Sequence, residues 1–316
     1  MADTSELSEV KRALLEKYLR GNLPQNTKPT DTITSSARES SVPLSNTDSR
    51  ASVSAVQSGG SKRPIFYLHV HWEGGAFYCF NLARDLGSDQ PFYVLEPYKF
   101  DDLQELPTLE TMATDYIKSI RSIQPEGPYL LGGFCGGGLI AYEIAQQLLE
   151  QGLAVDLLLL IEPKAGPAPL ELLGARFVAA FFRRIGKLVR LSQDKQLDGF
   201  LYVRHLYQLL RYPKYRNSPE VSLVPTTAFL RQNWLALFTW VITDYSASYY
   251  PGKLTYFWAR QERGCGKALW GKVAKAKEIE LHFIPGTASS CRNEHIHDTA
   301  QYLSACLSKA QAASLS

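Results

Sequence analysis

The feature of this sequence that most restricts its possible folds is a regular alternation of strand and helix patterns, which begins near Pro64. Short apolar runs of the kind that form buried parallel strands recur between amphipathic stretches at helical spacing. Such alternation is typical of a mostly parallel sheet with helices on both faces. The sequence therefore predicts an α/β fold, with strands at 64–70, 92–97, 129–134, 155–163, 253–260 and 278–284, and helices near 76–86, 109–123, 135–152 and 294–312.

The N-terminal residues 1–62 are predicted to lie outside this domain. Residues 5–22 carry apolar side chains at helical spacing and end in Gly-Asn, which predicts a short amphipathic helix. That helix either docks on another protein or is a marginal helix at a chain terminus. Residues 24–61 are rich in Ser, Thr, Asn and Pro, and they are expected to form a disordered linker because they bury too little surface to offset ordering entropy. The α/β domain is placed at 63–316.

Composition excludes several classes of protein. The formal net charge of +3 is too small to make nucleic acid or an anionic membrane the main partner. There is no apolar run of about 18 residues, so no membrane span is expected. The five cysteines are scattered without a C-x-x-C pair, which argues against a disulfide framework and a structural zinc site. A reducing, cytoplasmic location fits best.

The sharpest local signal is the motif G-x-C-x-G, which joins a predicted strand to a predicted helix around Cys135. A nucleophile on such a tight turn needs small neighbours, and the turn lifts its side chain to the carboxyl edge of the sheet. The following amide, that of Gly136, would point at a developing oxyanion, and the helix N-terminus would favour a thiolate. The alternatives are a buried structural cysteine in a glycine-rich turn or a phosphate-binding loop, which lacks its usual Lys-Ser/Thr.

Two longer blocks carry a family resemblance. FYLHVHWEGGAFYCFNLARDL and TLETMATDYIKSIRSIQPEGPYLLGGFCGGGLIAYEIAQQLLEQG resemble thioesterase domains of polyketide and nonribosomal peptide assembly lines, over about residues 64–308. The resemblance implies an α/β-hydrolase fold with an inserted helical lid, here about 166–245. It also implies hydrolysis or cyclisation of an acyl chain that a carrier protein presents on phosphopantetheine. Cys135 matches the nucleophile, where most relatives carry serine.

The resemblance also implies the other site residues. Gly136 matches one oxyanion donor, and the second donor is expected from the loop His71, Trp72, Glu73 and Gly74. Glu162 matches the acid that orients and stabilises an imidazole, unless it is a simple charge at a strand end. Glu262 is the alternative acid.

The catalytic histidine is where this sequence departs from the family. Ala288, in Pro-Gly-Thr-Ala, stands at the position of the expected base. Either histidine has been replaced by alanine, naturally or by engineering, or another histidine such as His295 serves after a shift of the loop. His297 is a second such candidate and His71 a weaker one.

A missing base limits release more than capture. A thiol near a helix N-terminus is partly ionised without a base, whereas water needs one to attack the acyl-enzyme. The expected function is therefore a thioesterase-like release enzyme with impaired turnover. The alternatives are an inactive acyl- or carrier-binding member, an amide-forming acyltransferase, or an esterase without a carrier protein.

Substrate and partners are also implied. No cofactor of its own is expected, and the carrier protein or synthase must act in trans, unless a soluble acyl thioester is the substrate. Aromatic residues of the lid suit a hydrophobic acyl chain or simply pack between helices: Phe177, Phe181, Phe182, Trp234, Phe238 and Trp240. Basic residues of the lid could receive an acidic carrier or form a solvated helix face: Arg183, Arg184, Lys187 and Arg190.

Overall fold

The computed structural model describes residues 50–69, 77–99, 107–163, 169–211, 226–232, 238, 241, 245, 247–261 and 276–313. The helix predicted at 5–22 lies outside this described part. The observed strands are β1 (Val53–Gln57), β2 (Ile65–His69), β3 (Phe92–Leu95), β4 (Tyr129–Phe134), β5 (Val155–Ile161), β6 (Tyr250–Ala259) and β7 (Ala276–Ile284). The observed helices are α2 (Phe77–Leu86), α3 (Leu109–Ile123), α4 (Gly136–Glu150), α5 (Pro169–Leu188), α6 (Gln193–Arg211), α7 (Thr227–Gln232), the 3-10 turn η2 (Ser290–Arg292) and α10 (Ile296–Ala313).

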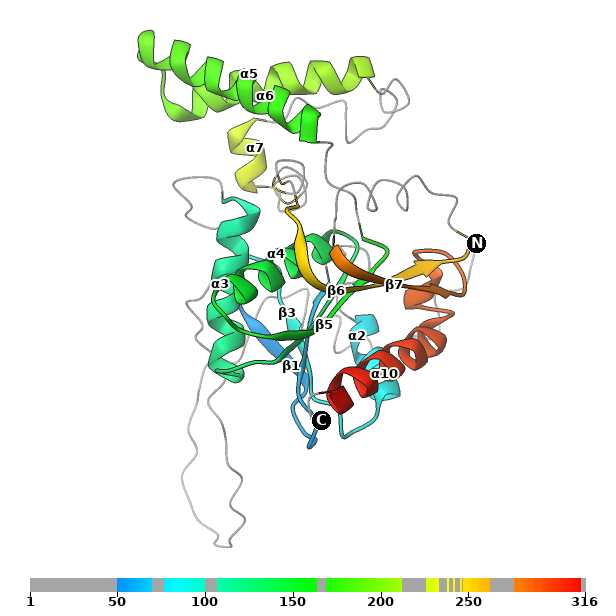
Figure 1. The fold of residues 1–316 in the computed structure, drawn as a ribbon. Coiled ribbons are helices and arrows are strands. Elements are labelled where there is room, and N and C mark those ends of the chain that lie inside the picture. Colours follow the sequence, from blue (N-terminus) through cyan, green and yellow to red (C-terminus); the bar gives the residue numbers. More distant parts are fainter. Residues whose placement is uncertain are drawn as a thin grey trace, which may run out of the picture. The chain divides into compact units, whose positions relative to one another are not determined.

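These strands form one seven-stranded sheet in the order β1-β3-β2-β4-β5-β6-β7. Every neighbouring pair is parallel except β1 and β3, which are antiparallel. Helices α3 and α4 cover one face of the sheet, and α2 and α10 cover the other (Figure 1). The predicted α/β fold with helices on both faces is confirmed.

Strands β2, β3 and β4 are buried along their whole length, which explains their continuous apolar sequences. On one face, Leu131 and Leu158 pack with side chains of α3 and α4. On the other face, Tyr67 and Leu130 pack with side chains of α2 and α10. Two such layers hold β4 and β5 in place, so the ends of these strands are fixed positions for functional side chains.

The predicted disordered linker is wrong for residues 53–57, because they form β1. This strand needs few apolar side chains, since the backbone of β3 supplies its hydrogen-bonding partner at the sheet edge. Its end is anchored by Gln57, whose side-chain amide donates to Gly87 O (2.8 Å) and Gln90 O (2.6 Å). The α/β domain therefore starts before the predicted boundary at residue 63.

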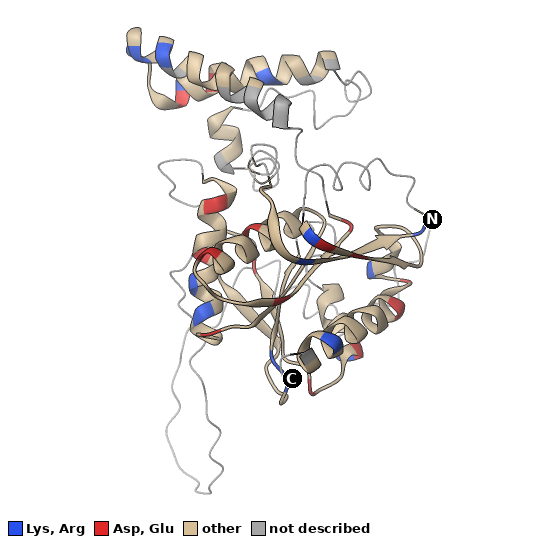
Figure 2. Cartoon of the chain, in the orientation of Figure 1, with Lys and Arg blue, Asp and Glu red and all other residues tan. Residues whose placement is uncertain are grey.

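The described residues between β5 and β6 include the helices α5, α6 and α7. Asp198 of α6 caps α7, since its Oδ1 accepts hydrogen bonds of 2.7 Å from both Thr227 N–H and Thr227 Oγ1–H. Basic positions lie at the C-terminal end of α5 (Figure 2), where Arg184 and Lys187 are exposed, as is Arg190 just after the helix. The role of this helical segment as a lid stays a prediction.

None of the described helices combines the length and the apolar character that crossing a bilayer requires.

Candidate active site

Cys135 occupies a strained turn between β4 and α4. Its backbone has φ 54° and ψ −122°, a conformation that side-chain-bearing residues rarely adopt. Two backbone hydrogen bonds fix the turn to β5 and to α4. Cys135 N–H donates to Ile161 O (2.9 Å), and Cys135 O accepts from Gly138 N–H (3.1 Å). This is the backbone geometry that a nucleophile elbow requires.

Two glycines allow the helix to start so close to the sheet. A Cβ on Gly133 would lie 2.7 Å from Gly137 O, and a Cβ on Gly137 would lie 2.6 Å from Leu68 O. Neither contact is sterically possible, so the first turn of α4 packs directly on β4 and β2 only because both residues lack side chains. The glycine pattern of the motif is thus explained by backbone packing.

Cys135 differs from the other described cysteines in its exposure. It is partly exposed, whereas Cys79, Cys291 and Cys306 are buried. Burial raises the pKa of the Cys79 thiol far above its ordinary value and raises the pKa of Cys306 to about 11. Among the described cysteines, Cys135 is therefore the one whose thiol a substrate in solution can reach most readily.

Glu162 lies at the end of the strand next to the elbow. Phe134 and Ile161 are paired in register, so Cys135 and Glu162 follow directly at the same carboxyl edge of the sheet. Glu162 also has a positive φ of 44°. Its N–H donates to Phe257 O (3.0 Å), and its Oε1 accepts the N–H of Ala259 at the end of β6.

Ala288 lies in the turn between β7 and α10. The turn is closed by Thr287 and Ser290, since Thr287 N–H donates to Ser290 Oγ (2.8 Å) and Ser290 N–H donates to Thr287 Oγ1 (3.1 Å). Ala288 O accepts from Cys291 Sγ–H and from Arg292 Nε–H, both at 3.3 Å. Together these bonds fix the backbone of the turn in which a histidine base is expected from the sequence.

The side chain of Arg292 connects this turn to the Cys135 turn. The guanidinium carbon of Arg292 lies 4.7 Å from the ring centroid of Phe134 and 5.8 Å from that of Tyr78. Phe134 directly precedes Cys135. The contact therefore brings the β7–α10 turn next to the end of β4, although the two segments are far apart in the sequence. Sequence reasoning missed Arg292, and no local motif could have identified it, because its partners are tertiary.

The alternative bases have other partners. His295 has Nδ1 3.3 Å from Asp298 Oδ2, and its ring lies so close to Gly286 that a Cβ there would be 2.4 Å from His295 Cδ2. His297 Nδ1 lies 3.5 Å from Asp85 Oδ2 on α2. Among the described contacts, neither imidazole is hydrogen-bonded to Cys135.

Several predicted site residues cannot be placed. His71, Trp72, Glu73, Gly74 and Glu262 lie outside the described residues. Gly136 is described, and it is the buried first residue of α4 directly after Cys135. Its N–H therefore belongs to the helix N-terminus, where an oxyanion donor is expected.

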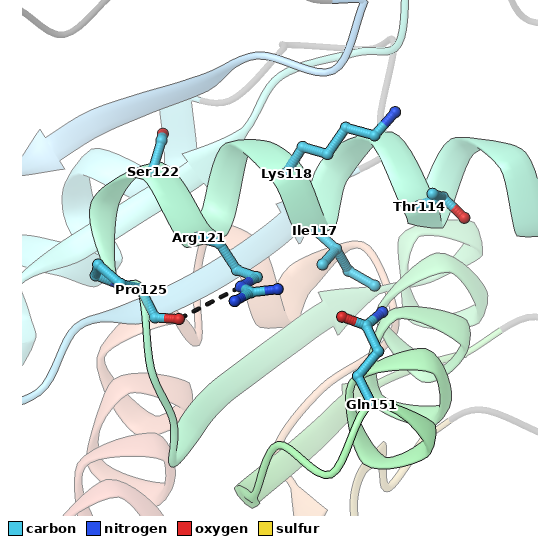
Figure 3. Close-up of a pocket in the computed structure, with 7 residues that line it drawn as sticks. All are labelled: Thr114, Ile117, Lys118, Arg121, Ser122, Pro125 and Gln151. Atoms are coloured by element: carbon cyan, nitrogen blue, oxygen red, sulfur yellow. Dashed lines mark hydrogen bonds between the residues drawn. The ribbon is translucent and has the colours of Figure 1, made fainter.

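A surface hollow of about 560 Å³ lies elsewhere on the molecule, between the C-terminal half of α3 and the end of α4 (Figure 3). Pro125 lines it and precedes β4, whereas Cys135 follows β4, so the hollow is at the opposite end of that strand. Arg121 in its wall donates from Nε to Pro125 O (3.3 Å). This hollow is separate from the candidate active site.

Comparison with known protein families shows to which family this chain belongs. The thioesterase domain family model matches residues 63–232, more than half of the chain. The chain belongs to the thioesterase domain family. A mostly parallel sheet with helices on both faces fits this membership.

Relatives of this thioesterase domain are large synthases. It is 41% identical over 109 residues to a dimodular nonribosomal peptide synthase of Bacillus subtilis, covering 34% of this chain and 4% of that protein. It is 27% identical over 310 residues to a non-reducing polyketide synthase of Cladonia grayi, covering 95% of this chain and 12% of that protein. The domain thus spans only a small part of these relatives.

Solved structures show the same fold. The NocB thioesterase domain from the nocardicin cluster matches with a TM-score of 0.52 and 24% identity, over 81% of this chain and 98% of that one. A four-domain nonribosomal peptide synthetase bound to AMP and glycine matches with a TM-score of 0.52 and 24% identity, over 79% of this chain and 20% of that one. The predicted α/β-hydrolase fold of the thioesterase type is confirmed.

Proposed function

We propose that this thioesterase domain captures an acyl group from a thioester on Cys135, in polyketide or nonribosomal peptide biosynthesis. The observation that carries the proposal is the positive φ of Cys135 on a strand-to-helix turn. In this conformation the side chain of a nucleophile is presented at the carboxyl edge of the sheet, beside the first amide of the helix. The partial exposure of Cys135 supports access by a substrate.

Capture is a thiol-for-thiol exchange. The Cys135 thiolate attacks the thioester carbonyl and gives a tetrahedral oxyanion, which the N–H of Gly136 would stabilise together with a second donor. The intermediate then expels the donor thiolate, which takes a proton from solvent. One thioester bond forms and one breaks. Because the attacking group is already a thiolate, this half of the reaction does not require a general base.

Release is the slower half in this proposal. Water must lose a proton as it attacks the acyl-enzyme, and Ala288 cannot accept one. Glu162 would orient an imidazole in a complete triad, and in this chain it has an alanine at the partner position. An amine acceptor would be used better than water, because an amine attacks without prior deprotonation. Amide formation is therefore the second candidate outcome.

The donor is proposed to be an acyl carrier protein or synthase that presents the acyl chain on phosphopantetheine, as the kinship with synthases suggests. A soluble acyl thioester is the minimal form of such a substrate. We propose that no cofactor of the domain's own takes part in these steps. We also propose a cytoplasmic site of action, with which the lack of a disulfide among Cys79, Cys135, Cys291 and Cys306 is consistent.

The first test measures capture. The full chain is incubated with an N-acetylcysteamine acyl thioester and analysed by intact-protein mass spectrometry. We expect one acyl adduct that is absent in Cys135→Ala and unchanged in Cys306→Ala, whose buried thiol is a matched control. If the adduct persists in Cys135→Ala, or does not form at all, the proposal is wrong.

The second test restores the base. Ala288→His is expected to raise hydrolysis by roughly 100-fold or more, the usual contribution of a general base. If Glu162 is the orienting acid, adding Glu162→Gln to Ala288→His should remove most of that gain, whereas Glu162→Gln alone should change the slow hydrolysis little. An unchanged rate in Ala288→His would mean that another histidine already serves.

A further inference from the structure

Arg292 lies where three segments of the candidate active site meet. Its guanidinium is next to the ring of Phe134 at the elbow and the ring of Tyr78 in α2, and its Nε donates to Ala288 O. These contacts hold a long side chain in one place beside the nucleophile turn. The same contacts leave a cation fixed next to the nucleophile turn.

The described surroundings of Arg292 do not neutralise its charge. In the described part of the chain, no carboxylate forms an ion pair with it, unlike Arg63, which pairs with Asp156 at 2.8 Å. The titratable groups near it include Tyr67 and Tyr78, and burial raises the pKa of both far above the ordinary value, so they stay uncharged at neutral pH. Partly buried positive charge of this kind favours an anionic partner.

The donor geometry of Arg292 is suited to oxygen anions. Nε is used by Ala288 O, which leaves the two terminal nitrogens with no described hydrogen bond. Paired N–H groups of a guanidinium match the two oxygens of a carboxylate or a phosphate.

We propose that Arg292 binds an anionic oxygen group of the thioester substrate, and that this group is a carboxylate on the acyl chain near the thioester carbonyl. The proposal rests on the proposed function, because it assumes that the acyl group reaches Cys135. The phosphate of the pantetheine arm is the other source of such an anion. Because the whole extended arm separates that phosphate from the thioester, a position next to the elbow favours the acyl carboxylate.

The test compares isosteric acyl groups with and without the charge. Malonyl and glutaryl thioesters of N-acetylcysteamine, which carries no phosphate, are compared with their terminal amides, and acylation of Cys135 is followed by mass spectrometry. We expect the carboxylates to react about 10- to 100-fold faster, the size of a charge-assisted hydrogen bond to a fixed donor. Arg292→Gln should abolish this preference, so that the carboxylates and their amides acylate Cys135 at equal rates.

Controls separate charge recognition from a structural effect. The ratio of two rates in one protein does not depend on the folded fraction, so a merely destabilised variant would keep the preference. Arg292→Lys should retain part of it, and Arg84→Gln, at an exposed arginine of α2, should retain all of it. A preference that is absent in the wild type, or that survives in Arg292→Gln, would overturn the proposal.

The remaining outcomes are also decisive. If the amides and the carboxylates acylate Cys135 equally, the proposed function stands and the role of Arg292 is wrong. If an Arg292-dependent gain appears only with phosphopantetheine thioesters, the bound anion is the phosphate and the acyl carboxylate is refuted. If no thioester acylates Cys135, both proposals fail together.

Discussion

Replacing Gly133 by alanine tests the packing that creates the elbow. The new methyl group would lie 2.7 Å from Gly137 O, 2.7 Å from Gly138 Cα and 2.8 Å from Gly137 C. All three are backbone atoms of the α4 turn, so no flexible side chain can move aside to relieve the clash. The start of α4 and the end of β4 must separate instead.

Forced separation of this kind typically costs about 1–3 kcal/mol, and more where backbone resists. At about 2–4 °C per kcal/mol for a domain of this size, the melting temperature should fall by roughly 2–12 °C. Because Cys135 lies between the displaced segments, its alkylation by iodoacetamide at pH 7 should also slow. Both quantities are measured on the full chain, by circular dichroism and by peptide mapping.

Gly59→Ala is the matched control, since a Cβ there would meet nothing within 4 Å. Its melting temperature and its Cys135 reactivity should equal those of the wild type. If Gly133→Ala melts together with Gly59→Ala and labels equally fast, the close approach of β4 and α4 is not what shapes the turn.

Two further predictions concern Glu143, a buried carboxylate of α4. Tyr245→Phe should lower the free energy of unfolding by about 1.5–3 kcal/mol, because Tyr245 donates a 2.7 Å hydrogen bond to Glu143 Oε2, whereas Tyr249→Phe at an exposed tyrosine should change it little in denaturant titrations. Burial raises the pKa of Glu143, so the folded state holds this proton more tightly than the unfolded state, and the stabilisation is full below the ordinary pKa of about 4.3 and is lost as pH rises through the raised pKa. Glu143→Gln should therefore gain stability relative to the wild type as pH rises above about 4.3; a difference that does not change with pH would contradict the protonation argument.

The strands of the sheet core could be predicted because their sequences are apolar throughout. The prediction for β4 matches the observed Tyr129–Phe134, and those for β2 and β5 differ by at most two residues at an end. Strand β1 could not be predicted in the same way. Its sequence VSAVQ is half exposed, and its order depends on pairing with β3 and on the anchoring of Gln57, both of which are tertiary.

Only part of the candidate site could be predicted from the sequence. Cys135 and Glu162 follow strands that pair in register, so their proximity follows from strand order once the sheet is recognised. The position of Ala288 could be read from the flanking Pro-Gly turn. The approach of Arg292 to Phe134 could not, because it depends on how a turn after β7 folds back over β4.

The antiparallel edge strand has a practical consequence for anyone who excises this domain. The family match begins at residue 63, which makes that position an attractive place to start a shortened chain. Such a chain would lack β1 and leave the four buried residues of β3 as a bare, apolar border of the sheet. Exposed borders of this type recruit other chains by backbone pairing, so aggregation of the shortened protein would reflect the cut and not the chemistry of Cys135.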